Sequence, residues 1–334
     1  STPYGSVENN TTQYLIKDIK TIFEKLGIEK SIIYGGSWGS TLALLFSEKH
    51  PELVHSLVLR GIFLCRKNDI RWFYQNGAHE IFPDKWNNFI CDIPTEEHDN
   101  LLKAYHKRIH STDIKTSEKF CMKWAEWEGQ CSSLMPSPQI VKQFSQCSVS
   151  LAKIETHFFI NDCFIDENQI INKIKSIENI KCYIVHGRYD IVCPLKQAYD
   201  LNSVYPKSQL SIINDAGHSL LESGTTRKVL EIFSKPNELI FFLFIIFFSS
   251  SHSIADELPN YKREKDIKEQ ILNFIFDAEL IDLKSNIEKN FTLLENVSTN
   301  SSKSILLLHG RGLNPNEPNI IGPLRSAISE SNIN

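Results

Sequence analysis

The sequence predicts an α/β fold, in which a partial parallel sheet is flanked by helices and carries a helical cap domain. Three observations predict it. An apolar run at 31–34 meets a glycine-rich turn and continues into a helix-like stretch at 40–46. Two later apolar runs, at 181–186 and 209–213, each lead into a polar loop. Before these two, residues 67–168 show helical spacing and few strand signals. Strands that alternate with helices are typical of a parallel sheet.

The glycine-rich turn, Gly35-Gly36-Ser37-Trp38-Gly39, has the G-x-S-x-G pattern of a serine at a sharp turn from strand to helix. Small residues two before and two after the serine let the backbone make this strained turn. The turn lifts the hydroxyl above the sheet edge, and the N-terminus of the next helix favours negative charge near it. We expect Ser37 to be a nucleophile, although a solvated serine in a glycine-rich turn would have the same pattern.

A serine nucleophile needs an imidazole that accepts its proton and a carboxylate that fixes the tautomer of the imidazole. In the α/β-hydrolases the acid and then the histidine follow the serine, each on a loop after a strand. Asp190 ends the first of the two later strand units, and His218 lies in the loop behind the second. Asp215 is a rival acid and His186 a rival base, but Asp215 shares the loop of the histidine and His186 ends a buried strand. We therefore predict the catalytic triad Ser37, Asp190 and His218 of an α/β-hydrolase.

Five motifs occur in one order along the chain: GGSWGSTLAL at 35–44, LRGIFL at 59–64, WAEWEG at 124–129, HGRYD at 186–190 and DAGHS at 215–219. Together they resemble the proline iminopeptidases (prolyl aminopeptidases), and the resemblance extends from residue 1 to about residue 235. It implies removal of an N-terminal proline from peptides by a serine triad, without metal or cofactor. It also implies that the backbone N–H of Trp38 is one half of the oxyanion hole.

An aminopeptidase must hold a cationic N-terminus, and carboxylates provide the strong charged hydrogen bonds for this. By the resemblance, Glu128 and Glu155 would bind the prolyl imino group, and Phe63 and Phe73 would wall the proline ring together with the neighbours of Phe73. Each glutamate lies among aromatic residues, although most glutamates lie on a solvated helix face. An esterase or amidase of the same fold is the alternative, and it would have no use for paired carboxylates.

Only about thirty residues precede the strand that leads to Ser37. A complete α/β-hydrolase has several earlier strands there, and an oxyanion loop rich in His, Gly and Pro. Loss of one oxyanion-hole donor costs about a hundred- to a thousandfold in rate. We therefore expect an N-terminally truncated chain with impaired activity, and an inert fragment is the alternative.

Residues 236–334 differ from the rest. The uncharged run at 239–248 is too short to span a membrane as a helix and, with the small residues at 253–255, resembles a secretory signal peptide in an internal position. Apolar residues near helical spacing at 261–291 predict one or two amphipathic helices. The strand-like run and His-Gly turn at 305–312 resemble the strand and oxyanion loop that open many α/β-hydrolases.

Two interpretations of this extension stay open. In the simpler one, two coding regions are read as one, so that the back of an iminopeptidase is joined to the front of an exported hydrolase-like protein. In the other, the chain is circularly permuted, and residues 305–312 restore the missing strand and oxyanion loop.

Composition sets the remaining expectations. Lys plus Arg is 36 and Asp plus Glu is 40, and this net charge of −4 gives no reason to expect nucleic acid or a membrane surface as a partner. Eight cysteines without C-x-x-C or metal spacing indicate reduced thiols in the cytoplasm and no metal site. We predict that residues 1–66 and 169–235 form the catalytic α/β unit, residues 67–168 the cap, and residues 236–334 an unrelated extension.

Overall fold

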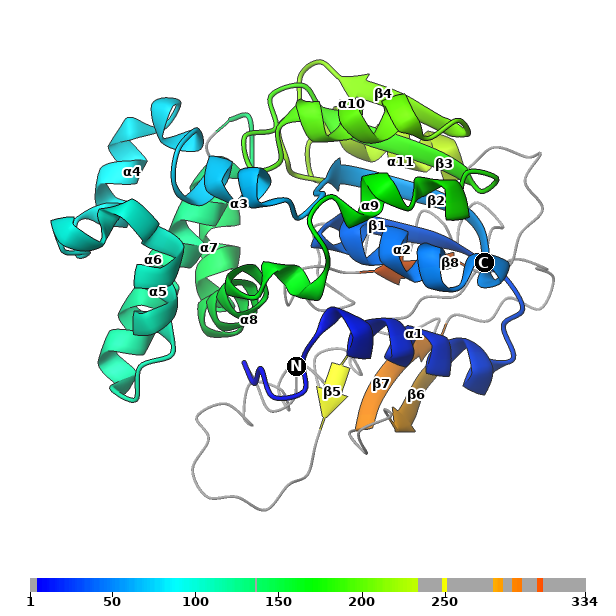
Figure 1. Cartoon of the computed structure of the whole chain (residues 1–334), viewed down its shortest axis with the longest axis horizontal. Coiled ribbons are helices and arrows are strands. Elements are labelled where there is room, and N and C mark those ends of the chain that lie inside the picture. The colour runs from blue at the N-terminus through cyan, green and yellow to red at the C-terminus, as the bar shows by residue number, and fades with distance from the viewer. Residues whose placement is uncertain are drawn as a thin grey trace.

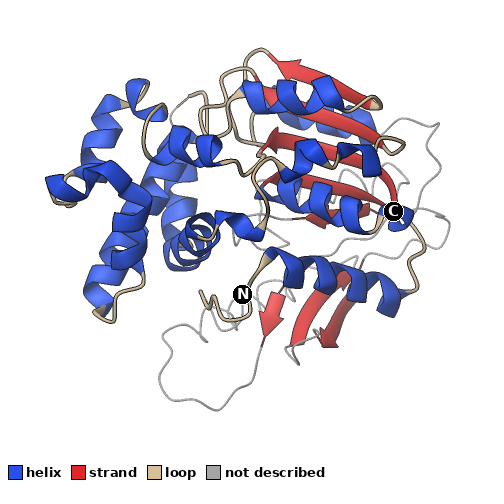
Figure 2. Ribbon diagram, in the orientation of Figure 1, coloured by secondary structure: helices blue, strands red, loops and turns tan. Residues whose placement is uncertain are grey.

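The computed structural model describes residues 5–135, 137–233, 248–250, 279–284, 290–295 and 305–308. These residues form two sheets with helices around them (Figure 1). The larger sheet has five strands in the order β4-β3-β2-β1-β8, and the smaller has three in the order β5-β7-β6. Helices flank the larger sheet, and a group of further helices lies to one side of it (Figure 2). The predicted α/β fold is confirmed.

All strands of the larger sheet run parallel to their neighbours. Their carboxyl ends therefore meet at one edge, and α/β sheets bind ligands at this edge. The inner strand β1, between β2 and β8, is buried along its whole length, as is typical of a parallel sheet covered on both faces. The strands are β1 (Ser31–Ser37), β2 (Val54–Ile62), β3 (Lys181–Gly187), β4 (Ser208–Ile213) and β8 (Ile305–Leu308).

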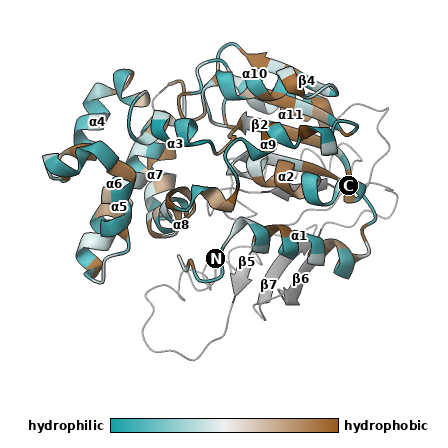
Figure 3. Ribbon diagram, in the orientation of Figure 1, coloured by the Kyte–Doolittle hydropathy of each residue, from teal (hydrophilic) through white to brown (hydrophobic). Residues whose placement is uncertain are grey.

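Five helices surround this sheet: α1 (Thr12–Leu26), α2 (Trp38–Lys49), α9 (Gln169–Asn172), α10 (Leu195–Val204) and α11 (Ser223–Phe233). Helix α1 is capped at its start by Thr11, whose side chain accepts a hydrogen bond from the N–H of Tyr14. Its C-cap is Gly27, whose φ of 63° is left-handed. The core between sheet and helices is mainly aliphatic, with Leu44 and Ile184 fully buried. Hydropathic colouring shows the apolar residues gathered on α2 and the neighbouring strands (Figure 3).

The helices to one side of the sheet form the cap, and their core is aromatic. The rings of Phe89 and Tyr105 are stacked at 4.3 Å, and Trp124 and Trp127 are almost completely buried beside them. The cap helices are α3 (Lys67–Tyr74), α4 (Pro83–Ile90), α5 (Leu101–Ile109), α6 (Ile114–Cys131), α7 (Pro138–Gln146) and α8 (Ser148–Ile160). Short 3₁₀ helices lie at Pro51–Leu53, Ala78–Glu80, Thr95–Asn100, Asp162–Phe164 and Ile174–Ser176.

The smaller sheet corrects one prediction for the extension. Strands β6 (Glu279–Lys284) and β7 (Asn290–Glu295) pair antiparallel within the stretch where the sequence predicted amphipathic helices, and β5 (Phe248–Ser250) pairs with β7. The prediction is therefore wrong for residues 279–284 and 290–291. Over 281–284 apolar and charged residues alternate with a period of two, which suits a strand better than a helix.

Strand β8 of the extension lies beside β1, with Ile32 opposite Ile305 and Gly35 opposite Leu308. Because the two strands are parallel, the end of β8 lies at the same sheet edge as Ser37. The circular permutation depends on this strand and on the turn at 309–312, and the turn lies outside the described residues. The same is true of the signal-like residues 239–247 and 253–255. Among the described helices we find none with the length and hydropathy needed to cross a membrane.

Candidate active site

Ser37 stands at the junction of β1 and α2 with φ 57° and ψ −124°, a conformation rare for a residue with a side chain. The turn is so tight that a Cβ added at Gly35 would lie 2.1 Å from the carbonyl oxygen of Gly39. Only glycine fits there. The hydroxyl of Ser40 donates a 2.6 Å hydrogen bond to the carbonyl oxygen of Ser37 and holds the turn closed. The sequence pattern around Ser37 thus forms the strained turn that it predicts. This turn, residues 35–39, is called the elbow below.

Asp190 and His218 contact each other, although 28 residues separate them in the sequence. The imidazole Nδ1 lies 2.7 Å from Oδ2 of Asp190, and both side chains are buried. The other carboxylate oxygen, Oδ1, accepts a 2.7 Å hydrogen bond from the N–H of Cys193. One oxygen is thereby held by the backbone while the other orients the histidine ring, so that Nε2 is the nitrogen available for proton transfer.

Strand β2 brings the histidine close to the elbow. The ring of His218 lies against Gly61, where an added Cβ would come within 2.9 Å of the ring. Gly61 precedes Ile62, the strand partner of Ser37. The guanidinium of Arg60 donates a 2.8 Å hydrogen bond to the carbonyl oxygen of His218. The sheet therefore gathers all three residues of the predicted triad at one edge.

The rival acid and base are held differently from Asp190 and His218. His186 is completely buried; its Nδ1 accepts a 3.1 Å hydrogen bond from the N–H of Ile62, and its Nε2 lies 2.8 Å from the carbonyl oxygen of Cys193 and 3.4 Å from Oδ2 of Asp190. Burial lowers the pKa of His186, and the ring joins the end of β2 to the loop of Cys193. Asp215 is exposed, and it is Asp190 that contacts the histidine.

Trp38 is the first residue of α2, so its N–H lies at the helix N-terminus beside the serine. This is where an anion would be stabilised by the N–H groups of the first turn. Its indole meets the ring of Phe158 edge-on at 4.8 Å, which ties the elbow to the cap helix α8.

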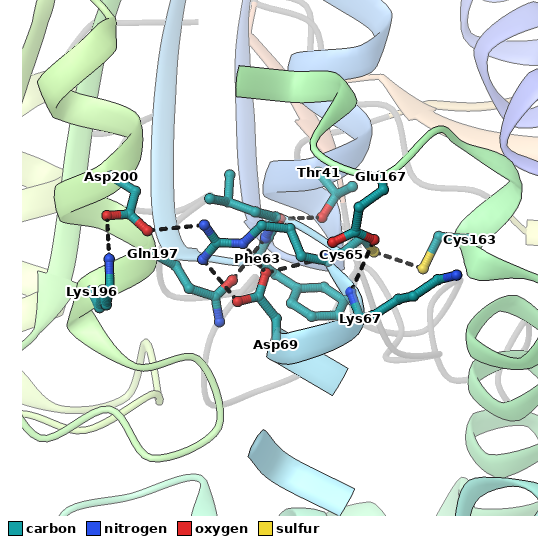
Figure 4. Close-up of polar contacts among 12 residues, drawn as sticks. Thr41, Phe63, Cys65, Lys67, Asp69, Cys163, Glu167, Lys196, Gln197 and Asp200 are labelled. Atoms are coloured by element: carbon teal, nitrogen blue, oxygen red, sulfur yellow. Dashed lines mark hydrogen bonds and ion pairs between the residues drawn. The ribbon is translucent and has the colours of Figure 1, made fainter. Parts of the chain in front are cut away.

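Phe63, predicted to wall the substrate ring, is held by side chains on both sides of its peptide. Its N–H donates to the hydroxyl of Ser40 at 3.2 Å, and its carbonyl oxygen accepts from Thr41 at 2.6 Å. The N–H of the next residue, Leu64, donates to Gln197 at 2.8 Å. Figure 4 shows Thr41 and Gln197 on either side of this segment, which leads from β2 into the cap. The backbone of Phe63 is therefore fixed beside the turn that carries Ser37.

Further contacts of this segment reach into the cap and to α10 (Figure 4). Nε of Arg66 donates to Asp69 at 2.8 Å, and its Nη1 donates to Asp200 of α10 at 2.9 Å. The thiols of Cys65 and Cys163 lie 2.7 Å apart, both buried. Ion pairs and thiols thus attach the beginning of the cap to the catalytic unit.

The two glutamates predicted to bind a cation lie on α6 and α8. Glu128 is completely buried and accepts a hydrogen bond from the phenol of Tyr74. Glu155 accepts a 2.8 Å hydrogen bond from the indole N–H of Trp124. The rings of Tyr74 and Trp124 stack at 4.1 Å with an interplanar angle of 15°. One aromatic stack therefore orients both carboxylates, of which Glu128 is buried and needs such a partner, while Glu155 is half-buried.

Phe73 lies deeper in the cap than the predicted wall would require. Its ring packs on Trp127 at 5.5 Å, and its carbonyl oxygen accepts a 3.1 Å hydrogen bond from that indole. Its neighbour Tyr74 contacts both Glu128 and the ring of Phe159. The sequence does not indicate that Tyr74 and Trp124 orient the two glutamates. Neither contact has a local signal, because 54 residues separate Tyr74 from Glu128 and 31 separate Trp124 from Glu155.

No cluster of three or more His, Cys, Asp or Glu side chains suited to a metal ion occurs among the described residues.

Comparison with known proteins agrees with this geometry. The family model "alpha/beta hydrolase fold" matches residues 1–225. The chain is 40% identical over 234 residues to a probable proline iminopeptidase of Leptolyngbya boryana, covering 69% of this chain and 73% of that protein. It is 44% identical over 225 residues to a proline iminopeptidase of Xylella fastidiosa (66% and 72% covered), and 41% identical over 244 residues to one of Arabidopsis thaliana (72% and 64% covered).

Among solved structures, an esterase from Exiguobacterium antarcticum superposes with a TM-score of 0.46 at 16% identity, over 67% of this chain and 73% of the esterase. The identities and coverage of the sequence relatives, together with the family model, decide the family. The chain belongs to the proline iminopeptidases, within the α/β-hydrolase fold.

Proposed function

We propose that this protein is a serine aminopeptidase that releases an N-terminal proline from peptides, with Ser37, Asp190 and His218 as its triad. The observation that carries the proposal is the buried 2.7 Å contact between Asp190 and His218, at the sheet edge where the elbow presents Ser37. Family membership supports the substrate, since the named relatives are proline iminopeptidases.

The reaction follows from these positions. The hydroxyl oxygen of Ser37 attacks the carbonyl carbon of the N-terminal proline, and its proton passes to Nε2 of His218. Asp190 stabilises the imidazolium that forms, and the N–H of Trp38 stabilises the oxyanion. His218 then gives the proton to the leaving amine as the peptide bond breaks. Water, deprotonated by the same histidine, releases proline from the acyl-enzyme and restores Ser37.

Glu128 and Glu155 give the site its preference for a free N-terminus. A prolyl imino group is cationic at neutral pH, and pairing with the buried Glu128 and the half-buried Glu155 replaces its hydration with charged hydrogen bonds. Phe63 and Phe159, whose rings meet edge-on at 5.8 Å, offer an apolar surface for the pyrrolidine ring. An esterase gains nothing from carboxylates beside its acyl group, so this pair of glutamates favours the aminopeptidase over the esterase.

The test uses the full chain and a proline arylamide. We expect slow hydrolysis of this substrate, since the sequence leads us to expect impaired activity, and a serine-directed phosphonate should bind covalently to Ser37 and stop it. Ser37→Ala should lower the rate by at least about a thousandfold. Ser47→Ala is the matched control, because Ser47 is a buried serine of α2, the helix that follows Ser37, and its hydroxyl donates to the carbonyl oxygen of Ala43. This change should leave the rate unchanged. Activity retained by Ser37→Ala, or phosphonate on another residue, would contradict the proposal.

A further inference from the structure

The segment that follows α6 lies against the loop that carries His218, and the side chain of Glu222 binds both segments. Its carboxylate accepts two backbone hydrogen bonds of 2.8 Å: Oε1 from the N–H of Leu134 in the cap and Oε2 from the N–H of Gly217 in the catalytic unit. The loops approach so closely that a Cβ added at Gly217 would lie 2.8 Å from the nitrogen of Leu134. One side chain thus holds the cap and the histidine loop together.

A second connection runs through Ser132. Its carbonyl oxygen accepts a 3.1 Å hydrogen bond from the N–H of His218, and its hydroxyl donates at 2.7 Å to the carbonyl oxygen of Glu128. Ser132 is buried, and so are the two residues that it joins. From the other side, Arg60 binds the carbonyl oxygen of His218. The backbone of His218 is therefore held between the cap and strand β2. Ser132, which binds it from the cap, lies about one helical turn after Glu128.

This arrangement has a consequence for an enzyme that cleaves after a single residue. The amine must sit at Glu128 while the carbonyl carbon next to it sits at Ser37, so the spacing between cap and triad has to be fixed. A misplacement of about 1 Å can cost about a hundredfold in rate. A carboxylate is well suited to hold two loops at one spacing, since a charged hydrogen bond is about twice as strong as a neutral one.

We infer that Glu222 is a positioning residue that sets the distance between the amine-binding Glu128 and the catalytic His218, and so fixes the single-residue register of cleavage. This rests on the proposed function. Glu222 acts through the backbone of Gly217 and Leu134 and touches no reacting atom.

The test compares two substrates in the full chain. Proline p-nitroanilide needs both the cap carboxylates and the triad, whereas p-nitrophenyl acetate has no amine and needs the triad alone. In Glu222→Gln one carboxylate oxygen becomes an NH₂ group that cannot accept a hydrogen bond. We expect kcat/KM for the anilide to fall about 10- to 100-fold, mainly through kcat because the bound carbonyl is misplaced, and that for the ester to change less than about threefold. Glu222→Ala should show the same split more strongly.

Two controls distinguish a change in the distance between Glu128 and His218 from a general loosening of the cap. Asp113→Ala removes the N-cap at the other end of helix α6, where Asp113 accepts from the N–H of Thr116 at 3.1 Å, and should lower stability while leaving kcat/KM for both substrates unaffected. Glu222→Gln combined with Glu128→Gln should lose little more anilide activity than Glu128→Gln alone, because both act on the same contact.

Equal losses on anilide and ester, or no loss on either, would overturn the inference while leaving the proposed function intact. A wild-type chain that hydrolyses the ester but not the anilide would overturn the proposed function, and the inference with it. Thermal unfolding of each variant shows that it is folded; if Glu222→Ala is not, Glu222→Gln decides the matter.

Discussion

The sheet holds its functional groups by backbone geometry, whereas the cap holds its functional groups by side chains. Ser37 is placed by a left-handed φ at the end of β1, and Asp190 by a loop whose N–H at Cys193 binds its carboxylate. In the cap, Glu128 is placed by the phenol of Tyr74, and Glu155 by the indole of Trp124. Backbone geometry depends on strand order and glycines, so it survives most substitutions. Side-chain placement depends on single partners and is lost with them.

The difference indicates which substitutions should change activity. At the sheet edge, replacement of a triad residue should lower the rate greatly, whereas replacement of a neighbouring side chain should change it little. In the cap, replacement of a neighbour should change substrate binding by a graded amount.

Asp190→Asn should have the largest effect, because an amide in place of the carboxylate favours the wrong tautomer of His218. The equivalent change in a serine peptidase lowers kcat about 10⁴-fold. The measurement is kcat for a proline arylamide. Asp215→Asn, in the same loop as the histidine, is the control and should retain full activity. If Asp215→Asn is the more damaging change, the backbone placement of Asp190 does not determine the acid.

Glu128→Gln should come next. Truncating one partner of a buried charge pair costs about 2–5 kcal/mol, or about 30- to several-thousandfold in kcat/KM for the arylamide. Hydrolysis of an acetate ester should stay unchanged. Glu126→Gln on the other side of the same helix is the matched control, since Glu126 accepts a 3.4 Å hydrogen bond from the side chain of Asn88 at the surface, away from the aromatic stack. A loss on the ester as large as that on the arylamide would show that Glu128 supports the fold and not the substrate.

Trp124→Phe sharpens the comparison, because it keeps an aromatic ring against Tyr74 but removes the hydrogen bond to Glu155. A hydrogen bond to a charged group contributes about 1.5–3 kcal/mol, so KM for the arylamide should rise about 10- to 150-fold with little change in kcat. Trp127→Phe removes an indole that donates to the backbone of Phe73, and should lower the melting temperature without changing KM. A KM that responds equally to both variants would contradict a specific role for Trp124.

The catalytic side of the site could be predicted further from the sequence than the cap side. The G-x-S-x-G pattern and the order of Asp190 and His218 after two strands lead directly to the contact that the structure contains, because strand ends in a parallel sheet meet at one edge. The orientation of Glu128 by Tyr74 depends on how α3 packs on α6, and 54 residues separate the two. No local pattern encodes such a contact. In the extension the predicted helix is a strand at 279–284, where a short alternation outweighs the helical spacing of its neighbours.

The smallest expected effect concerns the stability of the cap. Burial, together with the nearby charges of His106, Lys153 and His157, lowers the pKa of His110 to about 4. As pH falls from about 6.5 towards 4, the unfolded chain takes up a proton that the folded chain does not, so stability decreases. Because His110 is only partly buried, we expect about 1 kcal/mol from this residue. Chemical denaturation at pH 7 and pH 5 should show a smaller pH-dependent loss in His110→Gln than in the wild type. An equal loss in both would exclude this contribution.

The most direct test of the account is the ratio of kcat/KM for a proline arylamide to that for its N-acetyl derivative. Acetylation removes the cation that Glu128 and Glu155 would bind, and leaves the scissile bond next to Ser37 unchanged. We predict that the wild-type chain prefers the free imino group by about 30-fold to several-thousandfold. Equal rates on the two substrates would contradict the account and indicate an esterase or an endopeptidase.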